Sequence, residues 1–160
     1  MANSALQAWV EEVVSLTNAQ AVHWCDGSDA EIDRLNEMMV ADGSLVRLDR
    51  EQHPNCFYAR SDVNDVARVE GRTFICSTDE ADAGPTNNWK SPAEMHAVID
   101  LLFEDCMRGR TLYVVPYLMG PPGSPMAKVG VEITDSPYVV ANMRIMTRMG
   151  QVALDELGDD

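Results

Sequence analysis

Arginine is the residue type in this chain with the clearest potential for chemistry at a binding site. A planar guanidinium binds a carboxylate or phosphate through two parallel hydrogen bonds. Surface ion pairs and cations at helix C-termini are the more ordinary roles of arginine, so both interpretations stay open for each one. Eight of the twelve basic residues fall in the second part of the chain: Arg68, Arg72, Lys90, Arg108, Arg110, Lys128, Arg144 and Arg148.

The glycine- and proline-rich segment 120–130 has a superficial likeness to a phosphate-binding loop. A true P-loop has the pattern G-x-x-x-x-G-K-[ST], whose successive backbone N–H groups surround the phosphates. Here Ala127 precedes Lys128 and Val129 follows it, and three prolines remove N–H donors. The segment is therefore predicted to be a rigid connection between two strands.

Histidine and cysteine give no metal or catalytic pattern. His23, His53 and His96 are too dispersed in the sequence to predict a triad or a metal site. The four cysteines contain no C-x-x-C pair, which makes a zinc cluster improbable. We expect free, buried thiols at Cys25, Cys56, Cys76 and Cys106.

Composition limits the class of protein. At 160 residues with 46% hydrophobic residues, the chain is long enough for one compact domain. Its formal net charge of -14 argues against nucleic acid and anionic membranes as partners. No signal peptide and no membrane-spanning apolar run is recognisable, so we expect a soluble, cytoplasmic protein.

Four serines mark expected helix starts. Ser4 and Ser28 each stand three residues before Gln7 or Glu31, as in a capping box. The second of these helices is expected to stop near Gly43. Ser91 and Ser136 are each followed by proline, which is favoured at the first helical position.

Apolar periodicity predicts which face each helix buries. The predicted buried positions are Leu6, Trp9, Val10, Val13 and Leu16 in the first helix; Ile32, Leu35 and Met38 or Met39 in the second; Met95, Val98, Ile99, Leu102 and Cys106 in the third; and Val139, Met143, Met146, Met149, Ala153 and Leu157 in the last. Arg144 and Arg148 would share the opposite side of that last helix.

Short β-branched or aromatic runs between the helices predict strands at 73–76, 111–118 and 129–134. A polar turn between 45–48 and 56–59 predicts a hairpin. Because helices and strands are interspersed, the expected fold is a mixed α/β domain, a mixed sheet flanked by helices.

Several segments of the sequence resemble those of a known family. The stretch from Arg108 through Lys128, and its continuation from Gly130 to Gly150, are similar to the GTP-dependent phosphoenolpyruvate carboxykinases, closest to their bacterial members. The segments 65–70 and 84–89 match the family as well. The likeness spans nearly the whole chain.

The resemblance implies an enzyme that converts oxaloacetate and GTP to phosphoenolpyruvate, GDP and carbon dioxide. It further implies that residues 1–160 form one N-terminal, substrate-facing domain, and that the catalytic C-terminal domain lies outside this chain. The family uses Mn²⁺ and a second divalent metal with GTP, and their ligands have no counterpart here. We therefore expect no catalytic residue, bound cofactor or metal, and no activity, in this chain alone.

Arg68 is the one substrate residue that the resemblance assigns. It aligns with the family arginine that contacts the carboxylate of oxaloacetate or phosphoenolpyruvate. Arg72, Arg110, Arg144 and Arg148 receive no role from the family. An alternative from a different class remains: a freestanding acidic protein-interaction module derived from the same domain.

Overall fold

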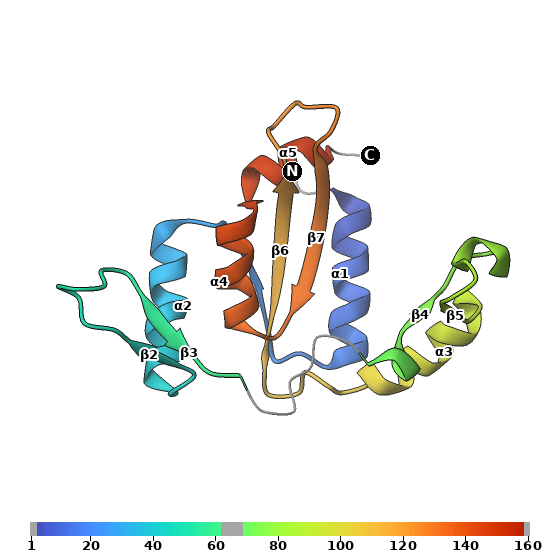
Figure 1. Ribbon diagram of the computed structural model, residues 1–160, viewed down its shortest axis with the longest axis horizontal. Coiled ribbons are helices and arrows are strands. Elements are labelled where there is room, and N and C mark those ends of the chain that lie inside the picture. The colour runs from blue at the N-terminus through green and yellow to red at the C-terminus, as the bar shows by residue number, and fades with distance from the viewer. Residues whose placement is uncertain (1–2, 62–68, 159–160) are drawn as a thin grey trace.

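The fold is built on a central mixed sheet, and this computed structural model describes residues 3–61 and 69–158. Strand β6 (Thr111–Met119) is its middle strand (Figure 1). β1 (Ala21–Trp24) pairs with it in parallel on one edge, and β7 (Lys128–Thr134) pairs antiparallel on the other. The two-residue strand β8 (Arg148–Met149) pairs antiparallel with the far end of β6. The mixed α/β class is confirmed.

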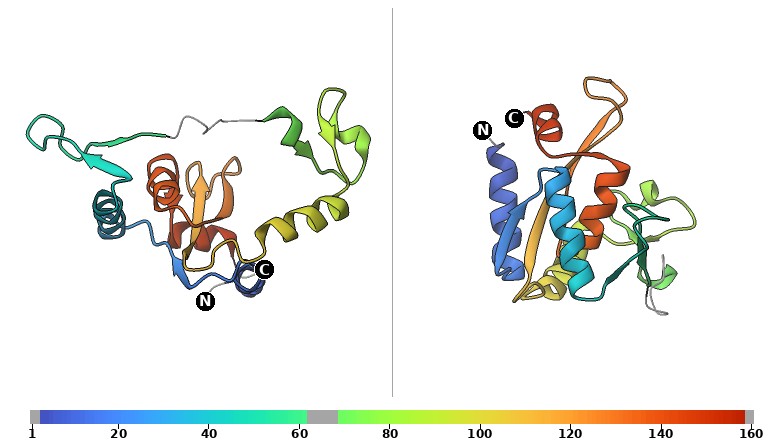
Figure 2. Two further views of the ribbon diagram at one scale, coloured as in Figure 1. Left: turned by 90° about the horizontal axis from the view of Figure 1, so that it is seen from below. Right: turned by 90° about the vertical axis from the view of Figure 1, so that its left-hand side faces the viewer.

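Side chains of β6 alternate between two hydrophobic clusters, as the period of a strand requires. Tyr113 and Val115 lie in a cluster with Leu35 of α2 (Asp29–Ala41) and Val140 of α4 (Pro137–Met146). On the opposite face, the other set of side chains packs against α1 (Ser4–Thr17): Leu112 and Val114 meet Leu6 and Val10. Helices therefore cover both faces of the sheet (Figure 2).

Pro116 lies where β6 changes its partner along one edge. β1 pairs as far as Val114, and β8 begins opposite Tyr117. The carbonyl oxygen of Pro116 accepts the Gly150 N–H at 3.0 Å. Because the N–H and C=O of one strand residue point to the same edge, the N–H that proline lacks is missing from this edge.

Two arms extend on either side of this centre (Figures 1 and 2). One is the predicted hairpin, formed by β2 (Leu45–Arg47) and β3 (Phe57–Ala59) in antiparallel register. The other contains the 3-10 helices η1 (Glu70–Arg72) and η2 (Glu80–Ala83), the parallel strand pair β4 (Phe74–Ile75) and β5 (Asn88–Trp89), and α3 (Pro92–Phe103).

Serine caps are confirmed for three of the four helices. The hydroxyls of Ser28, Ser91 and Ser136 each accept an N–H from the first turn of α2, α3 and α4. α2 ends at Ala41, close to the predicted stop. The first helix is different, because Asn3 rather than Ser4 accepts the Leu6 N–H at 2.9 Å. The buried face of α1 is also narrower than predicted, since Trp9, which was expected to be buried, is 42% exposed.

The prediction of one continuous last helix is wrong. α4 ends at Met146, and α5 (Gln151–Leu157) begins after β8 and Gly150. Arg148 therefore lies in a strand and not one helical turn beyond Arg144. Met146, predicted to be buried, is exposed, whereas Met149 is buried by its place in the sheet. The apolar spacing of this segment is that of one continuous helix, but the pairing of Arg148 and Met149 with β6 ends the first helix before it.

The predicted buried stripe of α3 is also wrong, because no residue of this helix is buried. Val98, Leu101, Leu102 and Phe103 of this helix are exposed apolar side chains. The prediction of buried thiols is wrong for three of the four cysteines. All four cysteines are free, but only Cys25 is buried, and Cys56, Cys76 and Cys106 are exposed, because they lie on the arms or in the turn that follows α3.

Candidate functional site

Arg68, the predicted substrate residue, lies outside the described residues. The residues that follow it are held in the second arm by hydrogen bonds to their backbone carbonyl oxygens. The Arg72 N–H and the Thr73 hydroxyl both donate to the Val69 carbonyl, at 3.0 and 2.8 Å. The Asn88 amide donates to the carbonyls of Glu70 and Thr73 at 2.9 and 3.2 Å. β5 thus fixes the turn that comes directly after residue 68.

Three other arginines make contacts within the domain that give each of them a structural role. Arg110 pairs with Asp135, just beyond β7. Arg144 donates from Nε to the Gly27 carbonyl at 2.6 Å and lies 3.3 Å from Asp29. Arg148 donates to the Gly120 carbonyl at 2.9 Å. These contacts join α4 and β8 to neighbouring loops.

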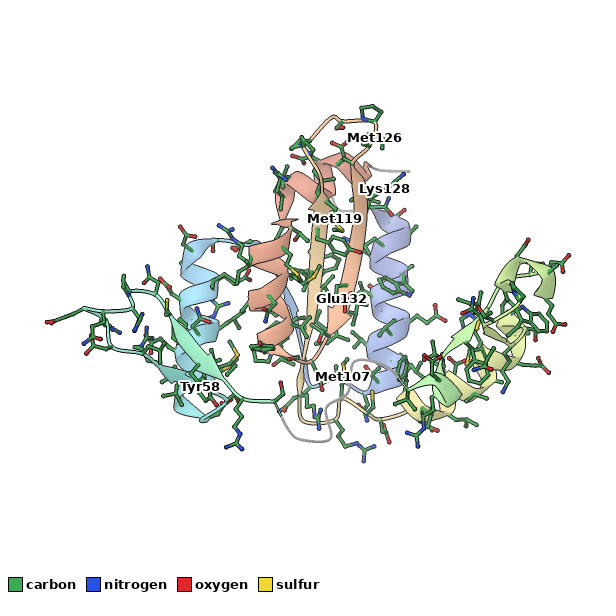
Figure 3. The ribbon with its side chains drawn as sticks, viewed as in Figure 1. Tyr58, Met107, Met119, Met126, Lys128 and Glu132 are labelled. Carbon is green, nitrogen blue, oxygen red and sulfur yellow. The ribbon has the colours of Figure 1, made fainter. Side chains whose placement is uncertain are left out.

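The loop 120–127 connects β6 to β7, as predicted, and is not arranged to bind a phosphate. Figure 3 shows Met119, Met126 and Lys128 at this end of the two strands. The Gly123 N–H, which a phosphate cradle would need, donates instead to the Glu156 carboxylate at 3.1 Å. A carboxylate at that position repels an anionic ligand.

A second group of side chains is brought together by β1 and α2. His23, Cys25 and Glu31 each offer one ligand atom, and these atoms lie within 4.8 Å of one another. His23 lies in β1, and Cys25 directly follows the strand and continues its pairing, since the Cys25 N–H donates to the Val114 carbonyl at 2.8 Å; the two side chains, two residues apart, therefore point to the same side. Glu31 reaches them from the first turn of α2. Among the residues that the structure describes, this is the group of histidine, cysteine and acidic residues that could hold a metal ion.

Glu31 is the centre of this group. Its side chain is 3% exposed, and its carboxylate lies 2.6 Å from His23 Nε2. It also accepts the Gly27 N–H at 2.8 Å and the Asp26 N–H at 3.3 Å. The capping-box prediction placed this carboxylate on the N–H of Ser28; instead Ser28 donates to Asp26. Glu31 therefore fixes the loop between β1 and α2.

Cys25 and Arg34 complete the surroundings. Burial, with added repulsion from Glu31 and Asp26, raises the pKa of the Cys25 thiol to about 12. Arg34 is exposed and its guanidinium lies 3.3 Å from His23 Nε2. His23 is partly exposed and packs edge-on against Tyr113, with ring centroids 5.8 Å apart. His53 and His96 are exposed and lie elsewhere.

Sequence reasoning missed this group because it did not recognise β1. If Ala21–Trp24 is recognised as a strand, the i, i+2 spacing puts His23 and Cys25 on the same side of the chain. Ser28 then marks the start of the next helix, whose first turn contains Glu31 and so lies close to both. The signal available in the sequence was that His23, Cys25 and Glu31 lie close together along the chain.

Comparison with known proteins identifies the class to which this fold belongs. The chain is a member of the phosphoenolpyruvate carboxykinase N-terminal domain family, whose sequence model matches residues 8–160. It is 54% identical over 156 residues to a GTP-type phosphoenolpyruvate carboxykinase of Chlamydia pneumoniae, covering 98% of this chain and 26% of that protein. The corresponding proteins of Corynebacterium jeikeium and Anaeromyxobacter dehalogenans are 53% and 54% identical, over 158 residues (99% of this chain, 26% of that protein) and 157 residues (98% and 26%).

The chain thus spans about a quarter of the length of the curated relatives it matches. Among the described residues, none of the helices has the length and apolar character needed to cross a bilayer.

Proposed function

We propose that this chain is the N-terminal domain of a GTP-dependent phosphoenolpyruvate carboxykinase. The observation that carries the proposal is identity of 53–54% across 98–99% of the chain with proteins of that name. In the proposed reaction, a carbon–carbon bond of oxaloacetate breaks and carbon dioxide leaves. The enolate oxygen that results takes the γ-phosphoryl group of GTP, giving phosphoenolpyruvate and GDP.

The contribution of this domain would be Arg68. A guanidinium can form two parallel hydrogen bonds with a substrate carboxylate, and so orient the molecule for decarboxylation. The turn at 69–73, held by Asn88, supports the role, because a substrate-binding side chain needs a fixed point of attachment nearby.

The described residues do not fit the metal and nucleotide of the reaction. Mn²⁺ favours oxygen-rich ligand sets, whereas the group at His23 and Glu31 includes a thiol. In loop 120–127 the Gly123 N–H, which a bound phosphate would need, already donates to the Glu156 carboxylate of α5. We therefore propose that both Mn²⁺ and GTP, with its second divalent metal, bind to parts of the enzyme beyond residues 1–160.

Two experiments test the proposal. The 160-residue chain should show no GTP-dependent consumption of oxaloacetate in a coupled assay; turnover would contradict the placement of the catalytic groups elsewhere. The genomic reading frame should continue past Asp160 into a G-x-x-x-x-G-K-[ST] segment. A stop codon directly after Asp160 would favour the freestanding interaction module.

The role of Arg68 is tested in the longer enzyme. Arg68→Ala should raise KM for oxaloacetate and phosphoenolpyruvate by tenfold or more, roughly the effect of losing a charge-assisted hydrogen bond, with KM for GTP unchanged. Arg72→Ala is the matched control, because Arg72 is exposed and in the same segment. Equal losses for nucleotide and acid, or equal effects of both variants, would reject the role.

A further inference from the structure

We propose that His23, Cys25 and Glu31 form a binding site for a zinc-like transition-metal ion, separate from the Mn²⁺ of the carboxykinase reaction. Imidazole nitrogen, thiolate sulfur and carboxylate oxygen are the three donor types that proteins use to bind zinc. Here one donor of each type comes from a nine-residue strand–loop–helix segment, with the ligand atoms within 4.8 Å of one another.

The distances are close to those of a tetrahedral site. Zinc bonds of about 2.0–2.3 Å place neighbouring ligand atoms roughly 3.3–3.6 Å apart. The His23 Nε2 to Glu31 distance of 2.6 Å would open by less than about 1 Å to admit the ion. The Cys25 sulfur, which lies within 4.8 Å of both other ligand atoms, would approach by at most about 1.3 Å. Such shifts are within the reach of side-chain rotation and leave the backbone in place.

The backbone around Glu31 holds the ligand in the required orientation. The Gly27 N–H donates to Oε2, while Oε1 is the oxygen that faces His23. The shorter backbone hydrogen bond thus fixes Oε2, while Oε1 accepts only the longer one, from the Asp26 N–H at 3.3 Å, and is turned toward the metal position. Outer contacts of this kind orient metal ligands in known sites.

Charge balance also favours a divalent ion in this place. Cys25 and Glu31 are each 3% exposed. Binding would transfer the thiol proton of Cys25 to solvent, so that one thiolate and one carboxylate neutralise the two positive charges of the ion. A neutral assembly avoids the cost of burying an uncompensated charge. The partly exposed side at His23 leaves room for a water molecule as fourth ligand.

Arg34 is the contact that opposes binding. Its guanidinium lies 3.3 Å from His23 Nε2, at the position where the ion would attach. Because Arg34 is exposed, its side chain can turn into solvent. It follows that removing this positive charge should strengthen metal binding, an effect that a purely hydrogen-bonded cluster would not show.

Co²⁺ is the probe for the test, because thiolate ligation gives it a sulfur-to-metal charge-transfer band and tetrahedral geometry gives intense visible bands. The 160-residue chain is used with Cys56, Cys76 and Cys106 replaced by serine, since these exposed thiols, and His53 beside Cys56, would bind metal adventitiously. Carboxykinase activity is not read, so failure here would leave the proposed function untouched.

The expected result is one Co²⁺ per chain with both spectral features, displacement by Zn²⁺, and release of one proton per metal ion bound. Cys25→Ser should abolish the charge-transfer band. His23→Gln should weaken Co²⁺ binding at least tenfold, and Arg34→Met should strengthen it. Absence of the band in the folded background protein, or a Co²⁺ affinity that neither Cys25→Ser nor His23→Gln weakens, would overturn the proposal. If Cys25→Ser does not fold, the band of the background protein, and the at least tenfold higher Co²⁺ concentration needed to produce it in His23→Gln, decide the question.

Discussion

The Asp26 carbonyl oxygen lies 2.1 Å from the position that a Cβ atom on Gly150 would occupy. The loop after β1 and the turn before α5 are therefore in contact, although they are far apart in the sequence. A Cβ on Gly27 would likewise come within 2.7 Å of the Met149 Cβ. Both turns need glycine because two backbones meet there.

Gly150→Ala should therefore destabilise the chain by at least about 3 kcal/mol, since a steric clash adds to the strain of a positive φ. Urea unfolding followed by circular dichroism measures the change. Gly109→Ala is the control, because Gly109 also has positive φ (76°) but has open space around it. The control should lose only about 1 kcal/mol. Equal losses would show that contact with Asp26 does not matter.

Glu31→Gln should lower the free energy of unfolding by roughly 2 kcal/mol, because a charged acceptor of buried N–H groups is replaced by an amide. The measurement is made with EDTA present, so that metal plays no part. Glu12→Gln, on the exposed side of α1, should change stability by less than about 0.5 kcal/mol. A Glu31→Gln protein as stable as the parent chain would contradict the structural role of this carboxylate.

Thiol labelling should separate the cysteines into two classes. With EDTA present, Cys56, Cys76 and Cys106 should react rapidly with a disulfide reagent, and Cys25 only after unfolding in urea. Burial shields Cys25 from the reagent, and its raised pKa keeps the sulfur protonated, whereas the thiolate is the form that reacts. Cys25→Ser should leave the rapid labelling of the folded chain unchanged and remove the additional labelling that follows unfolding. A fourth rapid thiol in the folded chain would be inconsistent with this arrangement.

Acid should weaken the contact between the end of α1 and the turn after α3. The Asn18 amide donates to Asp105 at 2.9 Å, and this hydrogen bond, followed by Arg108, lowers the pKa of the Asp105 carboxyl. A lowered pKa means that the contact stabilises the fold above the unfolded-state pKa, about 3.9, and that the stabilisation is lost as pH falls further.

Asn18→Gly removes the donor and retains freedom for the positive φ of residue 18 (53° in the parent chain). The stability difference from the parent should be greatest near neutral pH and shrink below pH 4 or so. In an Asp105→Asn background the same substitution should lose its pH dependence. An Asp105 carboxyl whose NMR titration is unaffected by Asn18→Gly would refute the assignment.

The apolar surface of α3 should cause self-association of the 160-residue chain. Leu101 and Leu102 are 75% and 71% exposed, and Phe103 is 50% exposed. Light scattering should show a mass that rises with protein concentration, more strongly at high salt, where the net charge of -14 is screened. Leu101→Lys with Leu102→Lys should lower the association, whereas Ala97→Lys on the same helix should have less effect. A concentration-independent monomer would contradict the prediction.

Sequence reasoning predicted well where the signal is local. Ser28, Ser91 and Ser136 cap helices because a serine hydroxyl and the first-turn N–H groups are neighbours in the chain. The hairpin and the loop between β6 and β7 were also predicted, from turn residues between apolar runs.

Predictions failed where distant contacts override the local pattern. The helical periodicity of 137–157 contains no sign that β6 will pair with Arg148 and Met149. The apolar spacing of α3 could not show that this helix lies on an arm away from the sheet. Of the site, Arg68 came from family resemblance and stays a prediction, while the group around Glu31 depends on a four-residue strand too short to be recognised.

The change of partner at Pro116 divides one edge of the sheet into two segments that can open separately. Cooperative hydrogen-bond networks transmit order along a strand, and an absent N–H donor breaks that continuity between β1 and β8. Local fluctuations that release β8 and the turn at Gly150 then need not disturb the pairing of β1. The loop after β1, which Glu31 fixes, is therefore coupled to β8 and the turn at Gly150 through the packing of Asp26 on Gly150 and of Gly27 on Met149, and not through continuous pairing along the sheet edge.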